Sequence, residues 1–279
     1  MSAPAIPAPP PELPAPEAPQ ALEALQPPEA PEPPEAPEAP RASIASGPRT
    51  GAGLSAAEFV RRHAALATVP LIPEISLYLS DAEPTVLWER AERATGDIEL
   101  APPFWAYPWA GGIGLARYLL DHPDQVAGRV VLDLAAGSGL VAIAAALAGA
   151  ARVTASDIDP IALAAIALNA AANGVSVQPS GIDLLTGEHD AAAVLAGRPG
   201  APAPDLVVVG DACYERRMAH RMLAFLARAR AAGARTLLGD PGRAYLPAAG
   251  LHALVVYAVP AWPGLEDTEV KQATVWSVG

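Results

Sequence analysis

The chain has 279 residues, of which 52% are hydrophobic, so it is long and apolar enough to bury a substantial core. Its formal charge of −12 leaves no basic surplus for binding phosphates, which argues against a nucleic-acid partner. A single cysteine excludes an internal disulfide, and the five histidines lack metal-ligand spacing, so we expect no metal ion. The sequence shows no secretory signal and no apolar stretch long enough to cross a bilayer, which predicts a cytoplasmic protein without membrane contacts.

The first segment, residues 1–52, is rich in proline, alanine and glutamate. Sixteen of the 32 prolines and seven glutamates lie within the first 50 residues, which contain no aromatic residue. Such a segment cannot bury enough apolar surface to offset the entropy lost on ordering, so we expect a disordered tail. The rest, 53–279, is predicted to form one domain, with an N-terminal cap segment at 53–122 and a core at 123–279.

The cap segment opens with a helix signal, because Ser55 and Glu58 have the spacing of a capping box for a helix through about Leu66. Residues 69–79 contain two prolines and then ISLYLS, which is typical of an edge-type or irregular strand. Residues 84–93 fit either a strand or a helix. The next stretch, PPFWAYPWAGG, concentrates aromatic rings just before a helix predicted at 113–120; Trp105, Tyr107 and Trp109 either staple the cap to the sheet or form an aromatic wall beside a ligand.

Strand and helix signals alternate along the core. The strand signals lie at 130–134, 152–156, 175–182, 205–209 and 236–238, and the helix signals at 140–148, 160–173, 190–195 and 215–232. This alternation predicts an α/β fold, a doubly wound and mostly parallel Rossmann-like sheet with helices on both faces. Two further strands, 251–258 and 269–277, predict an antiparallel hairpin at the C-terminal edge, which completes seven strands.

The stretch RVVLDLAAGSG at 129–139 reads as a buried strand followed by a ligand-binding turn. Gly137 and Gly139 allow a sharp turn and let a ligand approach backbone N–H groups at a helix N-terminus. Asp157 follows Gly137 by 20 residues, the spacing at which an acid on the neighbouring strand reaches the hydroxyls of a ribose. The pattern predicts a nucleotide-like ligand.

Acids follow successive strands, at Asp157, Asp183 and Asp211. Because the carboxyl ends of parallel strands meet at one crevice, we expect these side chains to surround one ligand, and Asp183 could accept a hydrogen bond from an adenine amine. Cys213 lies nearby, but the sequence places no histidine to activate its thiol, so we do not expect a nucleophile there.

Several stretches in succession resemble a known enzyme class. VVLDLAAGSG, TASDIDP, GIDLL and VVVGDACYE are similar, in this order, to the motifs of class I, seven-strand S-adenosylmethionine-dependent methyltransferases. PPFWAYPWAGG, the DxxY motif at 211–214 and GDPGRAYL at 239–246 resemble, more narrowly, the protein-lysine methyltransferases that act on the β-subunit of electron transfer flavoprotein. The resemblance runs from about residue 101 to the C-terminus and does not include the tail.

The resemblance implies S-adenosylmethionine as cofactor and a protein substrate, with the β-subunit of electron transfer flavoprotein as first candidate. The implied cofactor-binding residues are Gly137 and Gly139 at the methionine part with Asp133 and Ala135 close by, Asp157 at the ribose, Ile158 on the adenine, Asp183 at its amine, and Asp211. Asp211 and Tyr214 would hold the target amine as the catalytic pair, and the rings of Trp105, Tyr107 and Trp109 would line the substrate site by cation–π attraction.

Three alternatives stay open. Gly137, Gly139 and Ala142 also satisfy the GxGxxG/A pattern of an NAD-dependent oxidoreductase, with Asp157 at a suitable distance. A methyltransferase with these motifs could act on a ribosomal protein or a small-molecule amine. The fold could also serve as a non-catalytic binding module.

Overall fold

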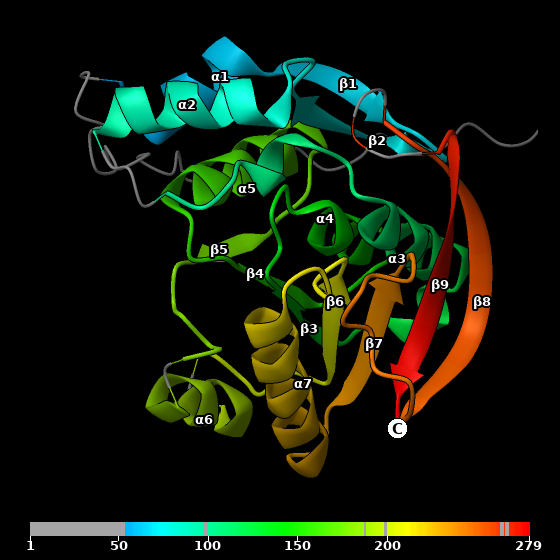
Figure 1. The fold of residues 1–279 in the computed structure, drawn as a ribbon. Coiled ribbons are helices and arrows are strands. Elements are labelled where there is room, and N and C mark those ends of the chain that lie inside the picture. Colours follow the sequence, from blue (N-terminus) through cyan, green and yellow to red (C-terminus); the bar gives the residue numbers. More distant parts are fainter. Residues whose placement is uncertain (1–53, 97–99, 187, 198–199, 263–264, 266–267) are drawn as a thin grey trace, which may run out of the picture. The chain divides into compact units, whose positions relative to one another are not determined.

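The computed structural model describes residues 54–279 except 97–99, 187, 198–199, 263–264 and 266–267; the predicted tail at 1–52 lies outside the described residues. The described chain contains a seven-stranded sheet in the order β5-β4-β3-β6-β7-β9-β8, flanked by helices on both faces (Figure 1). The predicted α/β class, the mostly parallel sheet and its antiparallel edge are confirmed.

The bounds of the core elements follow the predicted alternation closely. The strands of the large sheet are β3 (Val130–Leu134), β4 (Arg152–Ser156), β5 (Gln178–Ser180), β6 (Leu206–Gly210), β7 (Arg235–Asp240), β8 (Leu251–Pro260) and β9 (Val270–Val278). The core helices are α3 (Ala110–Asp121), α4 (Leu140–Leu147), α5 (Pro160–Ala172), α6 (Glu188–Ala196) and α7 (Arg216–Ala231). No helix in the described part of the chain is long and apolar enough to cross a bilayer, and the cytoplasmic location stays a prediction.

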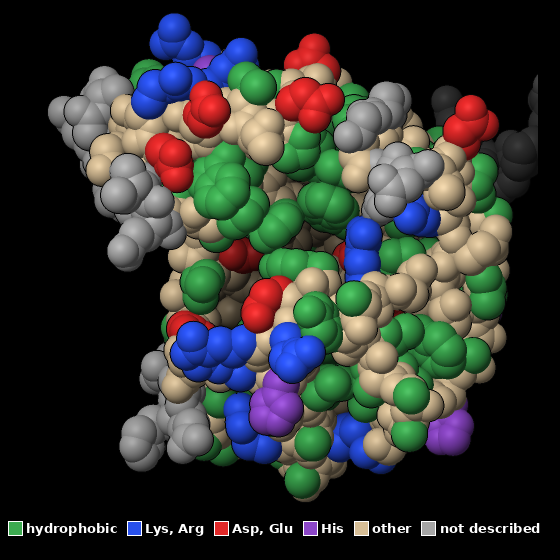
Figure 2. All heavy atoms as spheres, in the orientation of Figure 1, with side chains coloured by type: hydrophobic (Ala, Val, Ile, Leu, Met, Phe, Trp, Pro, Cys, Tyr) green, Lys and Arg blue, Asp and Glu red, His purple; other side chains and the backbone are tan. Residues whose placement is uncertain are grey.

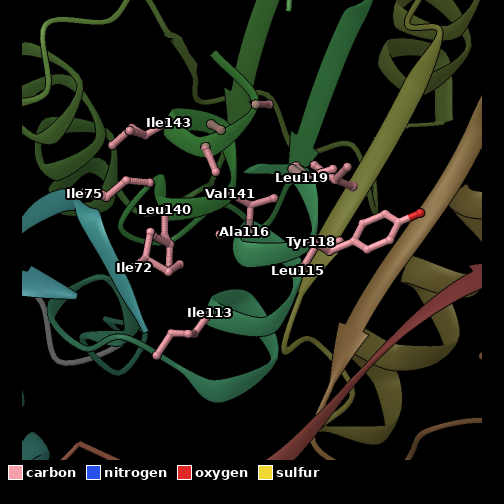
Figure 3. Close-up of a cluster of buried hydrophobic side chains, with 14 of the residues drawn as sticks. Ile72, Ile75, Ile113, Leu115, Ala116, Tyr118, Leu119, Leu140, Val141 and Ile143 are labelled. Atoms are coloured by element: carbon pink, nitrogen blue, oxygen red, sulfur yellow. The ribbon is translucent and has the colours of Figure 1, made fainter. Parts of the chain in front are cut away.

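The central strands are apolar on both sides because successive side chains point to opposite faces of a sheet that is covered twice. In β3, Val131 joins the core beneath α3 and α4, whereas Leu132 and Leu134 join the core beneath α6 and α7. This two-sided burial explains why the sequence of β3 shows no alternation of polar and apolar residues. Figure 3 shows the first core, where Ile113, Leu115 and Leu119 of α3 approach Leu140, Val141 and Ile143 of α4 and Ile72 and Ile75 of β2.

Helix α3 lies unusually close to the sheet. A Cβ atom added at Gly111 would lie 2.4 Å from the carbonyl oxygen of Gly239 in β7, and one added at Gly239 would lie 2.2 Å from the carbonyl oxygen of Gly111. Only two glycines facing each other permit this backbone contact. It brings the N-terminus of α3 to the carboxyl ends of β6 and β7, where the candidate site lies.

The N-terminal layer consists of α1 (Ala56–His63), β1 (Ala65–Val69), β2 (Ile72–Leu79) and α2 (Pro84–Thr95). The capping box of Ser55 and Glu58 is confirmed, but α1 ends at His63 because the following residues pair with β2. The strand expected at 69–79 is confirmed over most of its length as β2, and only its start was wrong, because Val69 ends β1 and a tight turn joins the two antiparallel strands.

Two asparagines attach β2 to the core: Asn169 in α5 and Asn173, which follows the last residue of this helix. Asn173 accepts from the backbone N–H of Ser76 and donates to its carbonyl oxygen at 3.0 and 2.7 Å. Asn169, fully buried, accepts from the N–H of Tyr78 at 2.8 Å and donates to the carbonyl oxygen of Ser138 at 2.9 Å. The predicted cap at 53–122 also contains α3, which packs on the large sheet, and this division of the domain stays a prediction.

Candidate functional site

A cavity of about 500 Å³ lies at the carboxyl ends of the parallel strands. Figure 2 shows the hollow near the middle of this face, with hydrophobic side chains around it and acidic side chains inside. Its volume is in the range that binds small organic cofactors. The structure brings every residue of the predicted site except Gly139 to its wall: Trp105, Tyr107, Trp109, Asp133, Ala135, Gly137, Asp157, Ile158, Asp183, Asp211 and Tyr214.

The turn after β3 wraps one end of this cavity. Ala135 and Gly137 have positive φ angles of 56° and 53°, and Gly139 caps α4 with a φ of 78°. A Cβ at Gly139 would also lie 3.2 Å from the side chain of Ile166, a tight contact, so both the backbone conformation and the packing against α5 favour glycine here. Ala135 adopts a conformation that L-residues rarely take, and such local strain is typical of ligand sites.

Asp157 braces the glycine turn from the neighbouring strand. Its Oδ2 accepts a hydrogen bond from the N–H of Gly137 at 2.8 Å, and its Oδ1 accepts from the N–H of Asp159 at 3.0 Å. Burial raises the pKa of Asp157, and the backbone donors oppose that shift. The next residue, Ile158, leaves 64% of its surface exposed at the cavity wall, an apolar area suited to covering a flat ring.

Asp133 is the most deeply buried acid of the site, only 1% exposed. Its Oδ2 accepts from the N–H of Ala142 in α4 at 2.9 Å. Burial raises the pKa of Asp133 to about 8, and the charge of Asp157 adds to this shift. Asp133 therefore joins β3 to the start of α4 and holds the glycine turn between them.

Asp183 ends the third predicted strand. Its carboxylate accepts hydrogen bonds from the backbone N–H groups of Leu185 and Thr186, each at 2.9 Å, and from the Thr186 hydroxyl at a shorter distance. Burial acts to raise the pKa of Asp183, but these hydrogen bonds outweigh it and the pKa is lowered. The carboxylate is thus ionised and fixed at the cavity wall.

Asp211 lies at the opposite end, on the loop after β6, with a positive φ of 58°. Its Oδ2 accepts from the N–H of Gly111 at 2.8 Å, and its Oδ1 accepts from Nε of Arg243 at 2.5 Å. Asp240, at the end of β7, holds the Arg243 backbone N–H at 2.7 Å and so fixes the loop that carries the guanidinium. Sequence reasoning missed Arg243 as a site residue, although the GDPGRAYL motif contains it.

Aromatic rings surround the mouth of the cavity on the side of Asp211. The ring of Tyr214 lies 4.9 Å from that of Phe104, and the ring of Phe104 lies 5.7 Å from that of Trp109. Burial raises the pKa of Tyr214 to about 12, with further contributions from Asp157 and other carboxylates, so its phenol is neutral at physiological pH. Phe104 was missed as a site residue, and its place inside PPFWAYPW was the available signal.

Trp105 and Tyr107 lie deeper than Trp109. They are 1% and 3% exposed and pack in the core of the N-terminal layer, although both also contribute to the cavity wall. The hydroxyl of Tyr107 donates to the carbonyl oxygen of Ala82 at 2.7 Å, whereas the indole N–H of Trp105 has no hydrogen-bond partner within the described residues. The two predicted roles of this cluster were to support the cap segment and to line the ligand site. Trp105 and Tyr107 fill both positions.

Cys213 is buried between the acids of the site. Burial raises the pKa of its thiol to about 12, and the carboxylates of Asp240 and Asp211 add to the shift. A thiol that stays protonated at physiological pH is a poor nucleophile. That Cys213 takes no covalent part stays a prediction.

Comparison with known proteins identifies the family. A family model described as "Ribosomal protein L11 methyltransferase (PrmA)" matches residues 117–195. The electron transfer flavoprotein β-subunit lysine methyltransferase of Homo sapiens is 38% identical over 212 residues, which cover 74% of this chain and 75% of that protein.

More limited similarities were also found. A ribosomal protein L11 methyltransferase of Pseudomonas aeruginosa is 54% identical, but over only 52 residues, 19% of this chain and 18% of that protein. A solved structure, magnesium protoporphyrin IX methyltransferase of Synechocystis with bound S-adenosylmethionine, is 15% identical with a TM-score of 0.43, over 70% of this chain and 93% of that one. The 38% identity to the human lysine methyltransferase, over three quarters of each protein, shows that the glycine turn is that of a methyltransferase and not of a dinucleotide oxidoreductase, and that the chain is a member of the electron transfer flavoprotein β-subunit lysine methyltransferase family.

Proposed function

We propose that this enzyme methylates lysine side chains on the β-subunit of electron transfer flavoprotein. The observation that carries the proposal is the 38% identity to a relative named for that activity, over three quarters of each chain. The reaction class is protein-lysine methylation with S-adenosylmethionine as cofactor.

The residues at the glycine turn fit this cofactor. A turn of small residues leaves room for the methionine part beside Gly137, and a carboxylate follows at Asp157 for a ribose. The exposed apolar surface of Ile158 and the fixed carboxylate of Asp183 suit the face and the amine of an adenine. When bound, S-adenosylmethionine supplies an electrophilic methyl group on a sulfonium. We assign these four residues to cofactor binding, with Asp133, Ala135 and Gly139 holding the turn.

The other end of the cavity suits an amine. Asp211 presents a buried carboxylate, Tyr214 a neutral phenol, and Trp109 an aromatic ring near its mouth. Methyl transfer is an in-line displacement, so the task of these side chains is to orient a lysine nitrogen and exclude water. We assign Asp211 and Tyr214 to the target amine, and Trp105, Tyr107 and Trp109 to the aromatic lining.

A ribosomal protein is the second candidate substrate. The family model for ribosomal protein L11 methyltransferases supports it, but the matched residues, 117–195, end before Asp211 and the loop that carries Arg243. They cover the cofactor half of the site and leave out the acceptor half. This distribution favours the flavoprotein.

Substrate choice is tested directly by incubating the enzyme with methyl-labelled cofactor and three targets: purified electron transfer flavoprotein, ribosomes and a small-molecule extract. We expect label on lysines of the flavoprotein β-subunit, located by peptide mass spectrometry, and none with heat-inactivated enzyme. Label confined to a ribosomal protein or to small amines would overturn the proposal.

The role of Asp157 predicts a specific loss. Asp157→Ala removes an acceptor for two ribose hydroxyls and the brace on the Gly137 N–H, and each hydrogen bond to a charged group is worth about 1.5–3 kcal/mol. Loss of one such bond alone lowers affinity by about 10–100-fold, so we expect affinity for S-adenosylhomocysteine, measured by calorimetry, to fall by at least that factor. Asp124→Ala, an exposed acid outside the cavity, serves as control. An unchanged affinity in Asp157→Ala would remove this residue from the cofactor site.

A further inference from the structure

The carboxylate assigned to the target amine already holds a cation. Arg243 reaches Oδ1 of Asp211 through Nε at 2.5 Å and Oδ2 through Nη2 at 3.2 Å. Only 3% of the Asp211 side chain and 20% of the Arg243 side chain are exposed, so water screens this pair weakly. The guanidinium also lies over the Trp109 ring, 5.6 Å from its centre. The ring and the carboxylate that suit a lysine ammonium are both occupied by an arginine of the chain itself.

This arrangement bears on a chemical requirement of the reaction. The lysine nitrogen must offer its lone pair to form the new N–C bond, while the electrons of the breaking C–S bond leave with the sulfur. An ammonium has no lone pair, so a proton must first pass from the lysine to water. Free lysine has a pKa of about 10.4, and an unpaired buried carboxylate within 4–6 Å would raise it further by about 1–3 units. A bare Asp211 would therefore bind the unreactive form.

We propose that Arg243 is a positioning residue that neutralises Asp211, so that the acceptor site takes the target lysine as a neutral amine. The inference rests on the proposed role of Asp211. The carboxylate keeps its orientation through the Gly111 N–H and the guanidinium. Because a carboxylate offers about four acceptor positions, it still accepts an N–H from the amine and aims the lone pair away from itself.

The titratable groups next to the pair leave the lysine as the group that changes charge there. Asp133, whose pKa is raised to about 8 by burial, lies in the glycine turn and titrates alike in the native enzyme and in the Arg243 variants, so the shift between them reports on the lysine. Behind the pair, the pKa of Asp240 on β7 is raised by burial, and the Cys213 thiol is protonated. On the cavity side, Tyr214 is a neutral phenol near Asp157 and Glu215. Arg243, whose backbone is held by Asp240, is fixed beside Asp211.

The test is the pH dependence of single-turnover methyl transfer to electron transfer flavoprotein at saturating cofactor. For the native enzyme we expect the rate to rise with pH to an inflection below the value of about 10.4 for free lysine. An inflection at or above that value would overturn the inference without any variant.

Two substitutions sharpen the result. Arg243→Gln should move the inflection upward by about one unit or more, whereas Arg243→Lys, which keeps the charge, should hold it within about half a unit while lowering the rate. Arg228→Gln, on the exposed side of α7, controls for the chemical change.

Two outcomes would contradict the inference. If Arg243→Gln is slower but its pH profile is unshifted, Arg243 has a structural role only; if its KM is lower and its pH profile is unshifted, Arg243 competes with the substrate.

A binding measurement separates this inference from the choice of substrate. In the complex with S-adenosylhomocysteine, the native enzyme should bind n-butylammonium, an analogue of the lysine side chain, at least about tenfold more weakly than Arg243→Gln, because the charge of the arginine cancels the charge of Asp211 that would attract a cation. Equal affinities would overturn the inference. If the native enzyme leaves the flavoprotein unmethylated, the proposed substrate fails, yet the butylammonium measurement still decides the role of Arg243.

Discussion

Asp211→Ala is expected to lower kcat/KM for methyl transfer by at least about 100-fold, while affinity for S-adenosylhomocysteine changes by only a few-fold. Asp211 lies beyond the glycine turn, at the acceptor end, and its carboxylate joins Gly111 of α3 to Arg243 of the loop after β7. Its removal takes away the orienting acceptor and leaves a guanidinium beside the incoming amine. Both effects slow methyl transfer, and neither changes the residues around Asp157 that are assigned to the ribose of the cofactor.

Steady-state kinetics with electron transfer flavoprotein and calorimetry with S-adenosylhomocysteine check the two halves of this expectation. Thermal unfolding must accompany them, because the substitution also leaves Arg243 without this ion pair. Asp124→Ala provides the same chemical change at an exposed position. A variant that keeps native kcat/KM would remove Asp211 from the acceptor site.

Gly111→Ala is expected to lower the free energy of unfolding by about 3 kcal/mol, the upper range for overpacking a dense interior. The new Cβ would meet the carbonyl oxygen of Gly239 at 2.4 Å and the backbone nitrogen of Asp211 at 3.0 Å, and neither backbone atom can rotate away. For a domain of this size the midpoint of thermal unfolding should fall by about 6–12 °C.

The neighbouring residue supplies a matched control. Gly112 lies in the same helix, and a Cβ built there meets nothing within 4 Å. Gly112→Ala should therefore leave the stability unchanged or raise it by up to about 1 kcal/mol, because alanine is the better helix former. Urea unfolding of both variants measures the difference. Equal losses in the two variants would contradict the backbone contact between α3 and β7.

Local signals in the sequence sufficed for the large sheet. The bounds of β4 agree residue for residue with the prediction, and α5 begins at Pro160, because β-branched residues and a proline in the first helical turn act over short distances. The expected strand at 175–182 proved shorter, Gln178–Ser180, since its extent depends on pairing with β4 alone. Convergence of the acids on one cavity followed from the topology of a parallel sheet.

Other features depend on contacts that no local pattern announces. The turn between β1 and β2 places Leu71 at a positive φ of 66°, a conformation that leucine gives no reason to expect. Arg243 lies 32 residues from Asp211 in the sequence. The two meet because the loop after β7 folds back to the end of β6, and no local pattern predicts that path. How deeply Trp105 is buried depends on how the N-terminal layer packs. Its aromatic character alone therefore could not decide whether it supports this layer or contacts a ligand.

The amide of Asn169 gives the N-terminal layer a meaning beyond covering the sheet. One end of this fully buried side chain holds β2 and the other holds the carbonyl of Ser138, inside the glycine turn. Loss of either partner would strand a buried polar group, at a cost of about 1–3 kcal/mol. The N-terminal layer thus supports the glycine turn, and a change in β2 that breaks its hydrogen bond to Asn169 would disturb the turn as well.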